Sequence, residues 1–207
     1  KGFVFIGRIS PQKNLHHLIE SYAKLDGKIR DVFPLIIYGK EDHLGYPNIS
    51  IEKTNYLLDL IKIVEKLNIK SNVIFKGYVA RDLIHSEVGS SSIFVSLSTH
   101  SDENFGMAAL RSLSSGARAI LTYWGGHIEF DSSFPGQIAY TPVSITDDGP
   151  QFDTDHVAKL MHDSYQAANN TFPSLLPSHY QVSQISDSFN KILKTDLNTE
   201  KLVPTLN

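Results

Sequence analysis

The sequence predicts an α/β protein built on a doubly wound parallel sheet of about six strands, with helices on both faces. Two observations predict this class. Short apolar runs typical of strands alternate along the chain with segments whose apolar residues recur at helical spacing. Glycines and polar residues directly follow several of the apolar runs, as they do in strand-to-helix turns. We expect ligands to bind where these turns gather, beyond the carboxyl ends of the strands.

The predicted strands are six short segments, at 3–6, 35–38, 73–75, 93–97, 119–122 and 137–140. Two helices follow the first two strands, because apolar residues recur every three or four positions across 15–23 and 57–67. A further helix is expected over 153–168, after acidic residues, and Ser178 is expected to cap a last helix that carries Val182, Ile185, Phe189 and Leu193. The segment 136–149 is rich in loop residues.

The composition excludes several classes of function. The chain has 207 residues, 41% hydrophobic and 20% charged, which is enough for a sizeable core. A formal net charge of -3 supplies no broad basic field, so nucleic-acid binding is not indicated. The chain has no cysteine and therefore no disulfide or thiolate chemistry. No run of about 18 apolar residues and no secretory signal is present. Of nine histidines only His16 and His17 are close in sequence, so no metal site is expected.

An acidic loop runs directly into a helix in the middle of the chain. The loop is Glu103-Asn104-Phe105-Gly106-Met107, and Gly116 closes the helix that follows. The first turn of a helix leaves N–H groups unpaired and carries partial positive charge, which favours an anion. Glu103, just outside that end, could accept a hydrogen bond from a sugar hydroxyl. An acidic loop followed by a helix start suits a ligand that has hydroxyls and phosphates. A tight strand-to-helix turn that binds no ligand would have the same sequence pattern.

A second glycine-containing turn follows the next strand. Gly125 and Gly126 permit a close approach of the backbone before another helix start. His100 and His127 flank the expected pocket and could contact hydroxyls, or they could be ordinary loop residues.

Two cations follow the first strand. Arg8 offers a planar fork for phosphate oxygens and Lys13 a mobile point charge, a suitable pair for a pyrophosphate. The alternative is that both are solvated surface cations. We expect the pair to converge in space with the helix tip at Gly106. Lys40, after the second strand, either adds to this field or is a solvated loop charge.

These motifs together resemble the C-terminal, donor-binding half of a retaining glycosyltransferase of family 4, which has the Rossmann-like architecture of the glycosyltransferase B fold. The residues that carry the likeness are Gly7, Arg8, Lys13, the loop 103–107, Gly116, Gly125, Gly126 and Glu129. The likeness extends to about Leu193 and implies a nucleotide-sugar-binding domain over 1–195, followed by a tail over 196–207. An acceptor-binding domain would precede this chain in the same protein.

The resemblance implies a function as well as a fold. The enzyme would move a sugar, with retention, from a nucleoside diphosphate sugar to an acceptor of the cell-surface polysaccharide or glycoconjugate type. It would need no metal or other cofactor. It would be cytoplasmic, with peripheral association at the inner face of the membrane through the preceding domain as an option. The sequence does not select the base, the sugar or the acceptor.

The resemblance also implies roles for particular residues. Arg8 and Lys13 would bind the diphosphate, and Glu103 matches the first glutamate of the family's paired-glutamate signature, which touches the transferred sugar and is discussed as catalytic. The amides of 105–107 would hold sugar hydroxyls and phosphate. The loop 77–79 would lie beside the base or be an ordinary turn. The expected donor-binding set is Gly7, Gly39, Gly77, Tyr78, Val79, Asn104, Phe105, Gly106, Met107, Arg111 and Gly126.

Arg111 is a departure from the family pattern. The second signature glutamate, seven intervening residues after Glu103, would hold the ribose hydroxyls, but arginine is a donor only and cannot accept from them. Arg111 could reach a donor phosphate, pair with Glu103 or Asp102, or face water. The runner-up function is therefore a non-catalytic nucleotide-sugar-binding module that has lost this glutamate. A sugar-nucleotide epimerase or a phosphorylase of the same fold is disfavoured by the loop 103–107.

Overall fold

The structure is a computed structural model that describes residues 1–42, 55–80, 88–89, 91–100 and 105–196. The chain divides into two compact units, Lys1–Ser174 and Leu175–Asn207. The first unit carries the sheet and its helices. The second carries a short 3-10 helix and one long α-helix. The predicted extent of the nucleotide-sugar-binding domain, 1–195, stays a prediction.

The first unit is built on a six-stranded sheet in the order β3-β2-β1-β4-β5-β6. All five pairings between neighbouring strands are parallel. The strands are β1 (Phe3–Ile6), β2 (Leu35–Tyr38), β3 (Val73–Gly77), β4 (Ile93–Ser96), β5 (Arg118–Thr122) and β6 (Ile138–Thr141). This order confirms the doubly wound sheet, and the direction of winding reverses between β1 and β4. Ligands of such sheets bind at that reversal.

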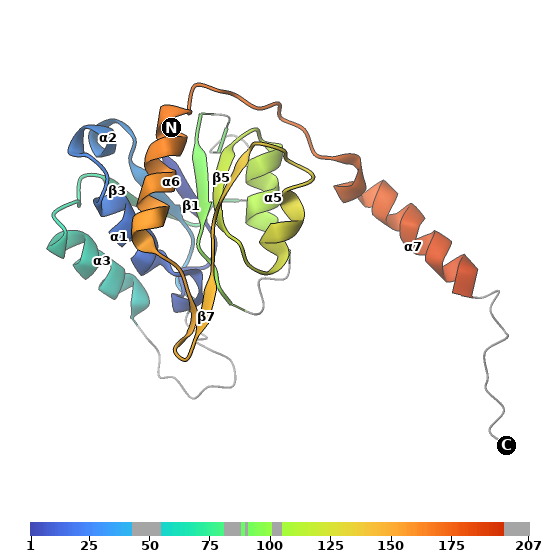
Figure 1. The fold of residues 1–207 in the computed structure, drawn as a ribbon, viewed down its shortest axis with the longest axis horizontal. Helices are drawn as coiled ribbons and strands as arrows, with labels where there is room; N and C mark the ends of the chain where they lie inside the picture. Colours follow the sequence, from blue (N-terminus) through green and yellow to red (C-terminus); the bar gives the residue numbers. More distant parts are fainter. Residues whose placement is uncertain (43–54, 81–87, 90, 101–104, 197–207) are drawn as a thin grey trace, which may run out of the picture. The chain divides into compact units, whose positions relative to one another are not determined.

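Helices cover both faces of the sheet, as predicted (Figure 1). On one face lie α1 (Leu15–Ala23), α3 (Tyr56–Lys66) and α6 (Thr154–Gln166), and on the other lies α5 (Met107–Ser114). A shorter helix, α2 (Gly27–Val32), joins α1 to β2. The bounds of the predicted strands shift by at most two residues at either end.

The core follows from the alternation of side chains along β1. Phe3 and Phe5, at most 1% exposed, pack in one buried cluster with residues of α1, α3 and α6. Val4 belongs to a second cluster on the opposite face of the sheet. Successive strand residues point to opposite faces, so a central strand that is apolar throughout needs cover on both sides.

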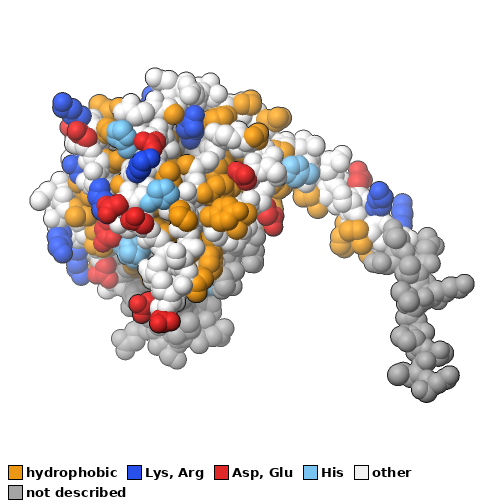
Figure 2. Space-filling model, viewed as in Figure 1, with side chains coloured by type: hydrophobic (Ala, Val, Ile, Leu, Met, Phe, Trp, Pro, Cys, Tyr) orange, Lys and Arg blue, Asp and Glu red, His pale blue; other side chains and the backbone are white. Residues whose placement is uncertain are grey.

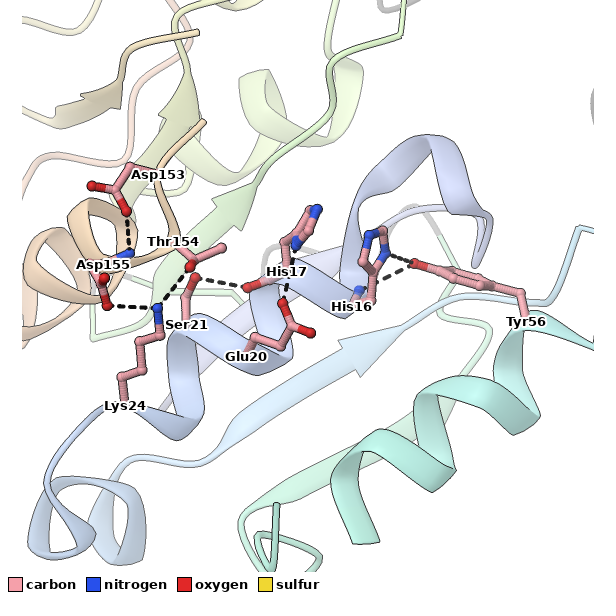
Figure 3. Close-up of polar contacts among 9 residues, drawn as sticks. All are labelled: His16, His17, Glu20, Ser21, Lys24, Tyr56, Asp153, Thr154 and Asp155. Atoms are coloured by element: carbon pink, nitrogen blue, oxygen red, sulfur yellow. Dashed lines mark hydrogen bonds and ion pairs between the residues drawn. The ribbon is translucent and has the colours of Figure 1, made fainter. Parts of the chain in front are cut away.

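Polar contacts also join α1 to its two neighbouring helices (Figure 3). The Tyr56 hydroxyl at the start of α3 lies 2.8 Å from His16 Nδ1 and accepts a hydrogen bond from the His16 backbone N–H. Lys24 Nζ donates to Thr154 Oγ1 at 2.7 Å and to Asp155 Oδ1 at 2.6 Å, at the start of α6. These contacts fix α1, and therefore the loop that precedes it.

Among the α-helices and strands of the described residues, one helix and one hairpin were not predicted. One is α2, which has only six residues and one buried side chain, Ile29. The other is a hairpin of β7 (Ser144–Thr146) and β8 (Gly149–Gln151), within and just beyond the segment expected to be loop. The strand β7 is exposed along its whole length, so it lacks the buried apolar alternation by which strands are recognised.

In the second unit, the predicted cap at Ser178 is wrong. Ser178 opens a 3-10 helix, η4 (Ser178–Tyr180), after Pro177, and the extended residue Gln181 then precedes α7 (Val182–Asp196). The carbonyl of Gln181 accepts from Ile185 N–H at 3.1 Å. The apolar residues predicted for this helix are exposed: Val182 by 83% and Phe189 by 61%. Figure 2 shows hydrophobic side chains on the surface of α7.

Candidate functional site

Two neighbouring cavities open at the carboxyl ends of the strands. The first, which we call the tip cavity, has a volume of about 230 Å³ and lies between the ends of β1 and β4 and the start of α5. The second, which we call the loop cavity, has a volume of about 330 Å³ and lies among the loops after β1, β2 and β3. Ile6, Gly7 and Arg8 line both cavities, so the end of β1 forms a wall that the two share.

The tip cavity brings together residues from distant parts of the sequence. Arg8 and Lys13 line it together with Gly106 and Met107. The two cations and the tip of α5 therefore meet in space, as the strand order requires when β1 lies beside β4. An anion placed there would face two cations and the positive end of a helix.

Lys13 is positioned by the residue that follows it. Lys13 ends a short 3-10 helix, η1 (Pro11–Lys13), and Asn14 then adopts a left-handed conformation with φ 51°. The Asn14 amide donates to the Leu97 carbonyl oxygen at 2.8 Å and to Thr99 Oγ1 at 3.0 Å, beyond the end of β4. The sequence analysis missed Asn14. Its signal was an asparagine just before a helix, a residue type that tolerates this conformation.

Arg8 is already paired. Its guanidinium donates to Asp42 at 2.5 Å in the loop after β2, and the Arg8 side chain is 64% exposed whereas that of Asp42 is 8% exposed. An ion pair with one exposed partner contributes little net stability. An incoming diphosphate would therefore compete with Asp42 for the guanidinium.

The tip of α5 is shaped by glycine. Gly106 precedes the helix with φ 69°, in the left-handed region that favours glycine, and its carbonyl accepts from Leu110 N–H at 3.0 Å. Met107 begins the helix, whose first N–H groups find no acceptor among the helix's own carbonyls. Phe105 packs edge-on against Phe130, with ring centroids 5.9 Å apart. Glu103 and Asn104 lie outside the described residues, so their predicted roles stay predictions.

The loop cavity is held together by backbone contacts. Gly39 N–H donates to the Gly77 carbonyl at 2.7 Å, and Gly7 N–H donates to the Tyr38 carbonyl at 3.0 Å. A Cβ on Gly39 would lie 1.9 Å from the Gly7 carbonyl oxygen, so this position requires glycine. Tyr78 and Val79 line the cavity. Gly77 does not line it, but its carbonyl accepts the hydrogen bond from Gly39, and its backbone has a φ of 70°.

Lys40 also lines the loop cavity. Its ammonium lies over the Tyr78 ring, 5.3 Å from the ring centroid, within the range of a cation–π interaction. Lys40 thus carries its charge at the cavity edge next to an exposed aromatic ring.

Neither cavity is lined by Arg111, Gly126 or Gly116. Arg111 is one turn beyond Met107 on α5 and is partly buried. Gly126 is buried in a 3-10 helix, η3 (Gly125–Phe130), so the second predicted helix start is a 3-10 and not an α start. Gly116, with φ 81°, ends α5 as predicted, since Gly116 N–H bonds to the Leu113 carbonyl and Ala117 N–H to the Ser112 carbonyl.

The comparison with protein families decides the assignment. Residues 1–131, more than half of the chain, match the family described as glycosyl transferases group 1. The chain belongs to this family. This confirms the resemblance drawn from the motifs at the strand ends.

Two curated relatives match about three fifths of this group 1 chain. Mannosylfructose-phosphate synthase of Agrobacterium fabrum is 27% identical over 121 residues, which are 58% of the chain and 25% of the relative. An uncharacterised glycosyltransferase of Methanocaldococcus jannaschii is 28% identical over 129 residues, which are 62% of the chain and 29% of the relative. The matches thus span little more than a quarter of these relatives' lengths.

Solved structures share the fold of the group 1 chain. HepE of Anabaena, solved with UDP-glucose, has a TM-score of 0.66 at 18% identity, and the match covers 94% of this chain and 49% of the HepE chain. Sucrose-phosphate synthase of Thermosynechococcus elongatus has a TM-score of 0.68 at 15% identity, and the match covers 96% of this chain and 46% of the synthase. The C-terminal domain of a group 1 glycosyl transferase of Francisella tularensis has a TM-score of 0.57 at 20% identity, and the match covers 82% of this chain and 80% of that domain. The fold is therefore that of the C-terminal half of a glycosyltransferase B enzyme.

No helix in the described part of the chain combines the length and the apolar character needed to cross a membrane. Nor do the described residues contain a group of three or more histidine, aspartate or glutamate side chains placed to hold a metal ion.

Proposed function

We propose that this chain is the donor-binding half of a retaining glycosyltransferase and that it holds a nucleoside diphosphate sugar across its two cavities. The observation that carries the proposal is the tip cavity, where Arg8 and Lys13 meet the start of α5 at the reversal point of the sheet. The diphosphate would lie along the wall that both cavities share. The sugar would then lie toward Gly106 and the nucleoside toward Tyr78.

The chemistry that these residues supply is charge stabilisation. As the bond between the sugar and the phosphate breaks, negative charge grows on the leaving diphosphate. Lys13 and the first amides of α5 already surround the tip cavity and would receive this charge, and Arg8 would join them after it leaves Asp42 for the diphosphate. Glu103 would orient the sugar and stabilise positive charge near its anomeric carbon. No metal or cofactor enters this scheme.

The first test measures binding by the 207-residue chain. It would be titrated calorimetrically with UDP, GDP and ADP, and we expect the preferred diphosphate to bind the wild type. Lys13→Ala should weaken that affinity by about tenfold to a hundredfold, because a hydrogen bond to a charged group contributes about 1.5–3 kcal/mol. Arg8→Ala is best made with Asp42→Asn, because the Asp42 carboxylate would otherwise lose the Arg8 guanidinium and repel the ligand.

The matched control is Lys62→Ala. Lys62 is an exposed lysine on α3 that pairs only weakly with Asp59, one turn away, and it lines neither cavity. Equal affinities in the wild type, Lys13→Ala and Lys62→Ala would remove the proposed diphosphate site. In the full-length enzyme, Arg8→Ala combined with Lys13→Ala should abolish transfer.

The second candidate is a nucleotide-sugar-binding module without activity, and Arg111 is the observation that favours it. Glutamate at this position could accept from ribose hydroxyls, whereas a guanidinium cannot. Binding of a nucleoside diphosphate sugar by the intact protein with neither transfer nor hydrolysis would favour the module. Turnover would favour the enzyme, whose acceptor we propose to be a cell-surface polysaccharide or glycoconjugate precursor made in the cytoplasm.

A further inference from the structure

A carboxylate lies against one of the two cations proposed to bind the diphosphate. The Arg8 guanidinium donates to Asp42 at 2.5 Å. The Arg8 side chain is 64% exposed, whereas that of Asp42 is 8% exposed. Asp42 lines the loop cavity, and Arg8 lines both cavities. A negative side chain therefore lies where the proposed function places a negative ligand.

The backbone holds Asp42 in this position. Ile9 N–H donates to the Lys40 carbonyl oxygen at 2.9 Å, and Asp42 N–H donates to the Ile9 carbonyl oxygen at 3.1 Å. These two hydrogen bonds fasten the loop after β2 to the residue that follows Arg8. Because the backbone of Asp42 is already fixed, little conformational entropy is lost when its carboxylate meets the guanidinium.

The neighbouring carboxylate in the same loop has a different contact. Glu41 Oε1 accepts a hydrogen bond from Leu57 N–H at 3.1 Å, in the first turn of α3. An acidic side chain at this place satisfies an amide that has no acceptor within the helix, and it complements the positive end of the helix. Glu41 thus has a structural contact with α3, whereas Asp42 contacts a residue proposed to bind the ligand.

The contact with Asp42 opposes the binding of a second anion at Arg8. A guanidinium has five N–H donors, so Asp42 and a diphosphate could both reach it, but the two anions would then repel each other at short range. Transfer of the guanidinium to the diphosphate avoids part of this repulsion, at the cost of the ion pair with Asp42. In either arrangement the carboxylate lowers the affinity for the diphosphate.

We propose that Asp42 is an internal competitor for Arg8: it holds the guanidinium while the site is empty and weakens the binding of a nucleoside diphosphate. This inference rests on the proposed function. Binding exchanges one anion for another at Arg8, so part of the interaction energy of the ligand is used to break the existing pair. After sugar transfer, Asp42 takes back the guanidinium as the diphosphate leaves. The carboxylate thereby favours release of this product.

The first test compares substitutions that remove or keep the negative charge. Asp42→Asn removes the charge and keeps the size of the side chain, whereas Asp42→Glu keeps a carboxylate. Asp59→Asn is the matched control, because Asp59 pairs with Lys62 on α3 at 3.1 Å and lines neither cavity. Each variant of the 207-residue chain and the wild type would be titrated calorimetrically at pH 7 with UDP, GDP and ADP.

We expect Asp42→Asn to bind the preferred diphosphate about threefold to tenfold more tightly than the wild type, because a partly exposed ion pair no longer competes. Asp42→Glu and Asp59→Asn should not show this gain. An unchanged or weaker affinity in Asp42→Asn would overturn the inference, and so would an equal gain in Asp42→Glu or Asp59→Asn. If no diphosphate binds either the wild type or Asp42→Asn, the proposed function fails, and the inference with it.

A second measurement follows the guanidinium itself. The side-chain Nε–H signal of Arg8 in ¹⁵N–¹H spectra would be identified by its loss in Arg8→Lys. Without ligand, this signal should differ between the wild type and Asp42→Asn, because only the wild type has the carboxylate beside it. A saturating amount of the preferred diphosphate should then shift the signal of the wild type. Identical signals in the two ligand-free proteins would contradict the proposed pairing, and a wild-type signal unmoved by the diphosphate would contradict the proposed exchange.

Discussion

Single residues determine how closely the loops around the cavities can approach. The loops after β1 and β2 continue the pairing of their strands, with Ile9 N–H bonded to the Lys40 carbonyl at 2.9 Å. Gly39 lies between two backbones at this point, bonded to Gly77 and nearly touching Gly7. The sequence marks Gly39 as a glycine after a strand, and the structure supplies the reason why no larger residue fits.

Gly39→Ala should destabilise the fold by about 2 kcal/mol or more, because the new Cβ would lie 1.9 Å from the Gly7 carbonyl oxygen and the backbone would have to move. Urea unfolding at pH 7 measures the change. Gly27→Ala is the matched control: it begins α2, and its nearest neighbour beyond the adjacent residues is the end of the Arg30 side chain, at 3.8 Å. We expect it to be neutral or slightly stabilising. Similar losses for both variants would contradict this account.

At the scale of elements, α1 is held by its polar side as well as by its core side. His16 contacts Tyr56 of α3, while Lys24 contacts the start of α6 (Figure 3). Burial lowers the pKa of His16 below its ordinary value of 6.5, and the nearby His17 lowers it further, while Glu20 raises it. The folded state therefore favours the neutral ring, to whose Nδ1 the Tyr56 hydroxyl can donate.

This pKa shift predicts how stability depends on pH. Above pH 6.5 the His16 ring is neutral in both states, and its contribution is fully present. As pH falls below 6.5, the unfolded chain takes up the proton more readily than the folded chain, so the contribution of His16 to the free energy of unfolding decreases. This decrease ends once the pH lies below the pKa of His16 in the folded state. His16→Gln should thus lose less free energy of unfolding than the wild type between pH 7.5 and about pH 5. Parallel curves from urea unfolding would show that His16 does not titrate in this way.

Local patterns predicted the elements that bury apolar residues and missed those that do not. The strands β1 to β5 and the helices α1, α3, α5 and α6 each bury apolar side chains, and this is what the spacing of apolar residues reports. The exposed strand β7 and the short helix α2 provide little of this signal. The cap at Ser178 failed because Pro177 and two 3-10 hydrogen bonds delay the helix, which begins at Val182.

At the scale of the whole molecule, both cavities lie within the unit Lys1–Ser174. The last segment of this unit is fastened to α5 and β5. The Ser174 hydroxyl donates to the Ser114 carbonyl at 3.1 Å, and the Phe172 ring lies 4.9 Å from the Arg118 guanidinium carbon. The large apolar side chains of α7 are exposed and bury little surface.

A chain that ends after Ser174 should therefore keep its melting temperature within a few degrees and its affinity for the preferred nucleoside diphosphate. A chain that ends after Asn170 is the control. It loses the contacts of Phe172 and Ser174 and uncovers Gly116, so its melting temperature should fall clearly below that of the longer chain. Differential scanning calorimetry compares the two. An equal fall in both would mean that 175–207 contributes to the stability of the first unit.

The sequence by itself determined the class of fold, the family and the residue types at the strand ends, because these depend on local spacing and on motifs that are continuous in the chain. Only the tertiary structure decided which of those residues meet. Lys13 and Gly106 line the same cavity because the sheet places β1 next to β4, and Asn14 ties the segment after Lys13 to Leu97 beyond β4. Likewise, the orientation of His127 depends on Thr122 and Ser98, two partners that become neighbours when β4 and β5 pair. Such proximity follows from strand order and hydrogen-bond direction, which no local pattern records.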